Sequence, residues 1–273
     1  FFAGGGPALA RLTAEPAVAL VGTRNPSPYG LEMAYDLGRG LGAAGVPVVS
    51  GLALGIDAAA HRGCVDSGGT AVAVLAGGPD VPYPRTNRRL YERVRKSGAV
   101  ISELPPGQRA YRWAFPARNR IMAGLAAVTV VVEAADPSGS LITSVFAADL
   151  GRTVAAVPGR VTSRFSAGSN RLIKDGALMV TSPRDLLDEL FGAGSRGLAP
   201  SADDLRGVKP GASLDPLEQG ALDAVEAGLG IDGVCTHAGV PAREARALLA
   251  RLESSGHLHR DGLGGYRRTA AVG

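Results

Sequence analysis

The sequence predicts a doubly wound α/β fold with a mostly parallel sheet, followed by a small α+β domain. Three observations lead to this prediction. Short apolar runs rich in Val and Ala alternate with helical patterns over residues 16–190. These runs are continuously apolar, which is typical of parallel strands that are covered on both faces. A tract dominated by Gly, Ala, Ser, Pro and Asp then separates this part from residues 216–273.

Strands and helices are expected to alternate along the first part of the chain. The apolar runs predict buried strands at residues 18–22, 46–51, 71–78, 99–103, 128–134, 153–159 and 178–183. Helices are expected between them at residues 28–44, 55–67, 86–97, 116–126 and 140–151, with a last one in RDLLDEL. This order is typical of βαβ units, in which consecutive strands are parallel. GLGAAG, residues 40–45, matches the dinucleotide pattern G-x-G-x-x-G, but it ends a helix and is therefore interpreted as a helix terminus.

The last third of the chain has a different composition. Residues 192–215 can bury little apolar surface and are predicted to form a flexible linker. Residues 216–273 contain three helical patterns, two of which begin with Pro, and then the Gly-rich hairpin LHRDGLGGYRR. Three helices and a hairpin are the pattern of a winged helix. The predicted division is thus residues 1–191, 192–215 and 216–273.

The charge of the chain is unevenly distributed. The net charge is +4, and residues 1–135 hold 14 Lys and Arg against 9 Asp and Glu. Residues 191–273 hold 9 against 10. A basic first half attracts polyanions such as nucleic acid. Charge that only keeps the protein soluble would explain the composition equally well.

Several classes of protein are disfavoured by the sequence. There is no run of eighteen apolar residues, so no membrane span is expected, and the first residues lack the basic start of a signal peptide. Cys64 and Cys235 are far apart, as expected for a reduced cytoplasmic protein. The histidines show no zinc-ligand spacing with these cysteines. No P-loop or G-x-S-x-G motif occurs and no paired-carboxylate site can be argued, so no metal, cofactor or catalytic residue is predicted.

Small and polar residues follow three of the predicted strands. These residues are Gly22, Thr23, Arg24, Ser50, Gly51, Ser138, Gly139 and Ser140. In open α/β sheets, ligands bind outside the carboxyl ends of the strands, where helix N-termini attract phosphate. Tight turns alone would also explain the glycines. Arg24 favours an anion site in its loop.

The segment RAYRWAFPARNR, residues 109–120, combines four arginines with three aromatic rings and no acid. Single-stranded nucleic acid is bound by cations that contact its backbone and by rings on which its bases stack. Arginine in particular both chelates phosphate and stacks. A helix is expected to start at Pro116, with Arg118 and Asn119 in its first turn, where a cation opposes the helix dipole unless an anion binds. The alternative is an exposed loop with solvated arginines and buried rings.

Residues 16–190 resemble one known family. The resemblance is carried by six blocks in consistent order: VGTRNPSPYG, VVSGLALGIDAAAHRG, PYPRTNRRL, FPARNRIMAGL, VVVEAADPSGSLITSVFAADLGRTVAAVPG and SAGSNRLIKDGA. They are similar to the DNA-processing protein A family, also called DprA or Smf. The distal segment resembles the winged-helix domain that many members carry.

The resemblance implies an extended Rossmann-like fold in a cytoplasmic homodimer without catalysis. Such a protein binds single-stranded DNA, protects incoming DNA during natural transformation and loads the RecA recombinase. The resemblance further implies a strand-binding pocket lined by Arg24, Ser50, Gly51, Arg112, Phe115, Arg118, Asn119, Arg120, Ser138, Gly139, Ser140 and Lys174. Many members carry Lys at the position of Arg112, which keeps the charge.

Two other functions are considered beside this one. The first is a nucleotide-hydrolysing enzyme of the phosphoribohydrolase type on a related scaffold. Its P-G-G-x-G-T-x-x-E loop supplies a catalytic Glu, which EAADPSGSLITS lacks. The second is a transcription regulator that acts through the winged helix, which the slightly acidic balance of residues 191–273 disfavours.

Overall fold

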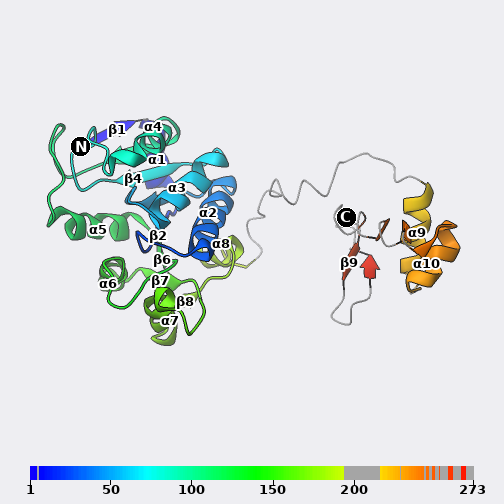
Figure 1. Cartoon of the computed structure of the whole chain (residues 1–273). Helices are drawn as coiled ribbons and strands as arrows, with labels where there is room; N and C mark the ends of the chain where they lie inside the picture. Colours follow the sequence, from blue (N-terminus) through cyan, green and yellow to red (C-terminus); the bar gives the residue numbers. More distant parts are fainter. Residues whose placement is uncertain are drawn as a thin grey trace. The chain divides into compact units, whose positions relative to one another are not determined.

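The computed structural model describes residues 1–4, 6–193, 216–227, 229–242, 244–245, 248–249, 252, 258–260 and 266–268. The chain forms two compact units, Phe1–Ala199 and Pro200–Gly273 (Figure 1). The predicted linker, residues 192–215, lies outside the described residues except for its first two positions.

The first unit is built on one eight-stranded sheet. In spatial order its strands are β1 (Phe2–Gly4), β5 (Ala99–Ile101), β4 (Ala71–Val74), β3 (Val48–Ser50), β2 (Val18–Val21), β6 (Val128–Val131), β7 (Thr153–Ala156) and β8 (Leu178–Met179). All neighbouring strands pair in parallel except β1, which is antiparallel to β5. The predicted mostly parallel α/β fold is therefore confirmed. The short edge strand β1 was not predicted.

Helices cover both faces of this sheet (Figure 1). One face packs against α2 (Pro28–Ala43), α3 (Ile56–Asp66), α4 (Arg88–Ser97) and α8 (Pro183–Phe191). The other face packs against α1 (Gly6–Ala14), α5 (Ala114–Leu125), α6 (Leu141–Asp149) and α7 (Ala167–Lys174). Within β2, Val18 and Leu20 belong to the first core, whereas Ala19 and Val21 belong to the second. Two cores explain why the strand sequences are apolar at every position.

The helix boundaries differ from the prediction at one place that matters for the site. The helix expected to start at Pro116 begins at Ala114, so Pro116 is its third residue. Proline is tolerated there because the first N–H groups of a helix have no partner within the helix. Arg118 is therefore the fifth residue of the helix and lies on its second turn, two residues further into the helix than predicted. Helices α1 and α7 were not predicted.

The glycine-rich segment 40–45 ends a helix, as predicted. Helix α2 stops at Ala43, and Gly45 has a φ of 77°, which a glycine adopts without strain. A Cβ at Gly38 would overlap the carbonyl of Ala60 in α3. These glycines thus serve helix packing and helix termination.

The second unit has a small core of its own. It contains α9 (Pro216–Glu226), α10 (Ile231–Ala238) and the antiparallel strands β9 (Leu258–Arg260) and β10 (Tyr266–Arg268). Leu222, Val234 and Leu249 are among its buried residues. Most of the predicted third helix, including Arg243, Arg246 and Arg251, lies outside the described residues. The winged-helix arrangement stays a prediction.

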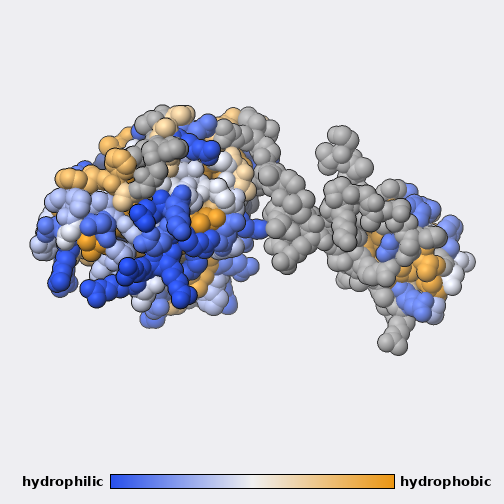
Figure 2. Space-filling view, turned by 90° about the horizontal axis from the view of Figure 1, so that it is seen from above, coloured by the Kyte–Doolittle hydropathy of each residue, from blue (hydrophilic) through white to orange (hydrophobic). Residues whose placement is uncertain are grey.

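No helix in the described parts of the chain is long and apolar enough to cross a membrane. Figure 2 views the molecule from the side on which Figure 1 places α4, and hydrophilic side chains predominate there on the first unit.

Candidate nucleic-acid interface

Eight of the twelve predicted residues line cavities at the carboxyl ends of β2, β3 and β6. From β2 the chain continues to β3, which lies on one side of β2 in the sheet. The later strand β6 lies on the opposite side of β2. In doubly wound sheets, a crevice opens at the point where the strand order reverses in this way. A cavity of about 350 Å³ occupies this place, and we call it the β2–β6 cavity. Its lining includes Thr23, Arg24, Asp57, Arg118, Asn119, Ser138, Gly139, Ser140 and Thr143.

A second, smaller cavity of about 70 Å³ shares Arg24 and Arg118 with the first. We call it the Phe115 cavity, because that ring forms part of its wall. The guanidinium carbon of Arg24 lies 5.0 Å from the centre of the Phe115 ring, which is a cation–π contact. Tyr83 packs against the same ring, with the ring centres 5.4 Å apart and tilted by 56°. An arginine and two rings thus face one small hollow.

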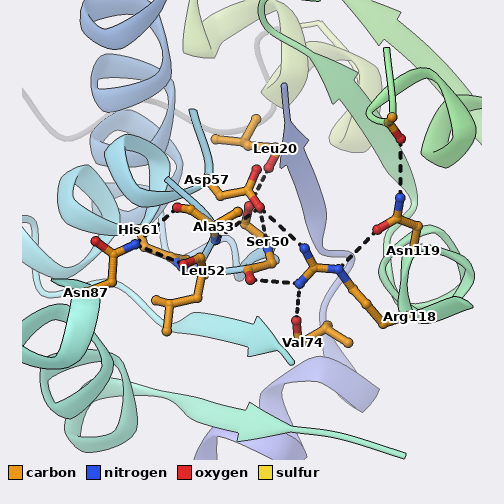
Figure 3. A network of polar contacts seen from close by, with 12 residues as sticks. Leu20, Ser50, Leu52, Ala53, Asp57, His61, Val74, Asn87, Arg118 and Asn119 are labelled. Atoms are coloured by element: carbon orange, nitrogen blue, oxygen red, sulfur yellow. Dashed lines mark hydrogen bonds and ion pairs between the residues drawn. The ribbon is translucent and has the colours of Figure 1, made fainter. Parts of the chain in front are cut away.

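Arg118 is held by a buried polar network between the two cavities (Figure 3). Only 7% of its surface is exposed. Its Nη1 donates to the carbonyl of Gly51 at 2.7 Å and to the carbonyl of Val74, and its Nε donates to Oδ1 of Asn119 at 3.0 Å. Three of the five N–H donors of the guanidinium are therefore used within the fold.

The same network contains an acid that balances Arg118. Nη2 of Arg118 lies 3.8 Å from Oδ2 of Asp57, which also accepts from the N–H of Gly51 at 3.2 Å and, more weakly, of Ala53 at 3.4 Å. Burial raises the pKa of the Asp57 carboxyl, while the charge of Arg118 acts in the opposite direction. Burial also lowers the pKa of Arg118, against the effect of Asp57. The absence of an acid near this segment in the sequence was therefore misleading.

The loop before α6 offers small polar groups to the β2–β6 cavity. The hydroxyls of Ser138 and Ser140 lie 2.8 Å apart, and Nδ2 of Asn119 donates to the carbonyl of Gly139 at 3.4 Å. A Cβ at Gly139 would meet nothing within 4 Å, so the loop is open on that side. The Oγ1 of Thr143 is buried and has no hydrogen-bond partner among the residues that the structure describes. A buried hydroxyl without a partner at the start of a helix fits an oxyanion such as phosphate.

Four predicted residues do not line either cavity. Ser50 is fully buried and donates to the carbonyl of Leu20 at 2.6 Å. Arg120 is exposed and pairs with Glu103. Arg112 is exposed on the loop before α5, and Lys174 is the exposed last residue of α7. A role of these four in DNA binding stays a prediction.

Other residues of the site were missed from the sequence. Tyr83 and Thr143 reach the cavities, and Asn87 donates from Nδ2 to the carbonyls of Leu52 and Ala53. Tyr83 and Asn87 stand in PYPRTN, a block that carried the family resemblance. That block was the one signal that could have found them.

A larger cavity of about 880 Å³ lies further along the β2–α2 loop, lined by residues that include Ser27, Tyr29, Glu133 and Arg160. It contains none of the predicted residues. Its buried carboxylate, Glu133, accepts from the N–H and the hydroxyl of Ser27 at 2.8 and 2.7 Å. That carboxylate already occupies the start of α2, so an anion is disfavoured there. Among the described residues, no group of three or more His, Cys, Asp or Glu is placed to hold a metal ion.

Residues 2–191 match the family model of DNA recombination-mediator protein A. The chain belongs to this family. The match covers the whole sheet, both cavities and all of the predicted site residues.

Individual members of the family are similar to this chain in sequence and in structure. A relative from Mycobacterium tuberculosis with a DNA processing protein DprA name is 43% identical over 256 residues, which cover 92% of this chain and 64% of the relative. The crystal structure of DprA from Streptococcus pneumoniae is 42% identical with a TM-score of 0.65, covering 70% of this chain and 65% of that one. A Helicobacter pylori DprA structure, described for its single-stranded DNA binding mode, is 27% identical with a TM-score of 0.62, covering 69% and 85%. The chain spans less than two thirds of the curated relatives of S. pneumoniae and M. tuberculosis that it matches.

Proposed function

We propose that this chain binds single-stranded DNA at the β2–β6 and Phe115 cavities and performs no covalent step on it. The observation that carries the proposal is the position of Arg24, whose guanidinium lies over the Phe115 ring where the two cavities meet. A ring and a cation in one hollow can hold one base and the adjoining phosphate at once. The H. pylori relative, whose DNA binding mode is described, supports the same ligand.

The phosphate is proposed to sit at the start of α6. Ser138, Ser140 and Thr143 supply hydroxyls there, and Gly139 leaves the approach open. Arg24 is exposed and makes no ion pair among the described residues, so its charge is available to the same phosphate. Arg118 is proposed to act mainly by positioning, because it is buried, its Nε and Nη1 donate to Asn119, Gly51 and Val74, and its charge is paired with Asp57.

A hydrolytic function is disfavoured by the one carboxylate that lines these cavities. Asp57 is 5% exposed, is tied to two backbone N–H groups and is paired with Arg118. A general acid or base must reach its substrate within hydrogen-bond distance. Asp57 is instead committed to holding the β3–α3 loop. Release of adenine from AMP at enzymatic rates would contradict this assignment.

Binding should show the salt dependence of phosphate contacts. We expect the affinity for labelled oligo-dT, measured by fluorescence anisotropy, to fall as salt rises, with a log–log slope of about −0.7 for each phosphate contacted. The double variant Arg24→Ala/Arg112→Ala should bind more weakly, with a slope less negative by about 1.4 if each arginine contacts one phosphate.

The matched control removes two arginines that lie on α4. Arg93 pairs with Asp66 and Arg95 pairs with Glu92, and neither lines a cavity. Arg93→Ala/Arg95→Ala changes the net charge by the same amount and should leave the slope almost unchanged. The proposed site would be contradicted by an affinity that does not change with salt concentration. It would also be contradicted if both double variants lowered the affinity equally.

We further propose that the bound strand is handed to a RecA-type recombinase and that the chain acts as a homodimer in the cytoplasm. These parts rest on the family alone. Light scattering of the purified chain tests the dimer. Recombinase filament assembly on oligo-dT coated with a single-strand binding protein tests the transfer, and assembly that this chain does not accelerate would contradict it.

A further inference from the structure

An exposed pair of aromatic rings lies on the loop just before α5. Tyr111 is 48% exposed and Trp113 is 62% exposed, although both belong to residue types that are usually well buried. Their rings are parallel to within 6°, with centres 6.2 Å apart. The two rings thus contact each other while a large part of each faces solvent. We call this pair the Tyr111–Trp113 platform.

The loop that carries the platform is fixed by hydrogen bonds. Gly78 donates its N–H to the carbonyl of Gln108 at 2.8 Å, and Nε2 of Gln108 donates to the hydroxyl of Tyr111 at 2.7 Å. The N–H of Ala114 donates to the carbonyl of Tyr111 at 3.0 Å, where α5 begins. Rings held outward in this way keep apolar surface in water, which costs free energy in the unbound protein.

The surroundings of the platform favour nucleic acid over an apolar protein surface. Arg109 and Arg112 flank the rings, are exposed and make no ion pair among the described residues. The platform also ends two residues before Phe115, so it continues the site proposed above. Exposed rings that are interleaved with cations in the sequence offer both kinds of contact that a single strand needs, stacking for bases and charge for phosphates.

We propose that the Tyr111–Trp113 platform is a second stacking station, which takes a base of the strand outside the Phe115 cavity while Arg112 contacts the adjoining phosphate. The inference rests on the proposed function and extends it. The cavities bind a short stretch, and the platform lengthens the strand that one chain holds.

Trp113 is the only tryptophan of the chain, so its fluorescence reports on the platform directly. We expect oligo-dT of about twenty nucleotides to quench this fluorescence by stacking, and oligo-dT of about four nucleotides to bind with much less quenching. Binding of the long oligonucleotide without quenching overturns the platform.

The second experiment separates flat rings from apolar area. Tyr111→Leu/Trp113→Leu keeps apolar side chains and removes both rings, and it should lower the affinity for the long oligonucleotide about 5- to 150-fold, the effect of losing one stacked base. Tyr111→Phe/Trp113→Phe keeps both rings and should bind within a few-fold of the original chain. Neither variant should change the affinity for the short oligonucleotide.

The outcomes distinguish the two proposals. If the original chain binds neither length, the proposed function fails and the platform with it. If both lengths bind and the leucine variant binds the long one as tightly as before, only the platform is overturned, and a protein partner becomes its better occupant. Urea unfolding of both variants checks that the loop still folds.

Discussion

Arg118 and Arg112 belong to one short segment but lie in opposite environments. Arg118 is buried and uses its donors on Gly51, Val74 and Asn119. Arg112 is exposed, stands between Tyr111 and Trp113 in the sequence, and makes no ion pair with a described residue. The difference shows that arginines close together in the sequence can be divided between a buried position that holds loops together and an exposed position that stays open to solvent.

The largest effect that tests this division is on stability. Arg118→Ala should lower the free energy of unfolding by about 3–5 kcal/mol, because Asp57 stays buried without its partner. Arg24→Ala should lower it by less than about 1 kcal/mol, since it loses one exposed contact with a ring. Urea unfolding followed by Trp113 fluorescence measures both. Equal stabilities would show that the buried network does not hold these loops.

Lowering the pH should reduce the stability of the buried region around His61 before it affects the exposed arginines. His61, on α3 with Asp57, is fully buried, and burial lowers its pKa to about 4 from 6.5. Folding therefore favours the neutral form of His61. The free energy of unfolding keeps this contribution above pH 6.5 and loses it as the pH falls toward 4. The loss should amount to about 3 kcal/mol.

The variant His61→Gln isolates this effect. A glutamine amide can still donate to the carbonyl of Val72, which accepts from Nε2 of His61 at 3.2 Å if that nitrogen carries the proton. Stability measured from pH 7 to pH 4 should fall less steeply in the variant than in the original chain. Parallel curves would mean that folding does not lower the pKa of His61.

A smaller effect is expected from two glycines that border the same cavities. A Cβ at Gly51 would overlap the Arg118 guanidinium, so Gly51→Ala should lower the free energy of unfolding by about 1–3 kcal/mol. A Cβ at Gly139 meets nothing within 4 Å, so Gly139→Ala should change it by less than about 0.5 kcal/mol. The same urea experiment compares the two variants. A larger loss of stability for Gly139→Ala than for Gly51→Ala would contradict the view that Gly51 is packed and Gly139 is open.

The sequence predicted the strands better than the roles of single residues. Apolar runs identified seven strands of the sheet because a strand covered on both faces needs apolar residues throughout. The three residues of β1 are too few to show such a pattern, and α7 was hidden in the polar segment SAGSNRLIK. The loops that carry Arg24 and Ser138–Ser140 were also placed correctly, because parallel strands end at one edge.

By itself, the sequence determined seven strands of the sheet, most of its covering helices and the edge at which polar residues gather, since local periodicity encodes these features. Only the tertiary structure decided which arginine is buried and which is free. Arg118 meets Gly51 across 67 residues of chain, and its partner Asp57 comes from another helix. Spacing within one helix does not reveal such a partner, because the desolvation that distinguishes the two arginines arises only when distant loops close over one of them.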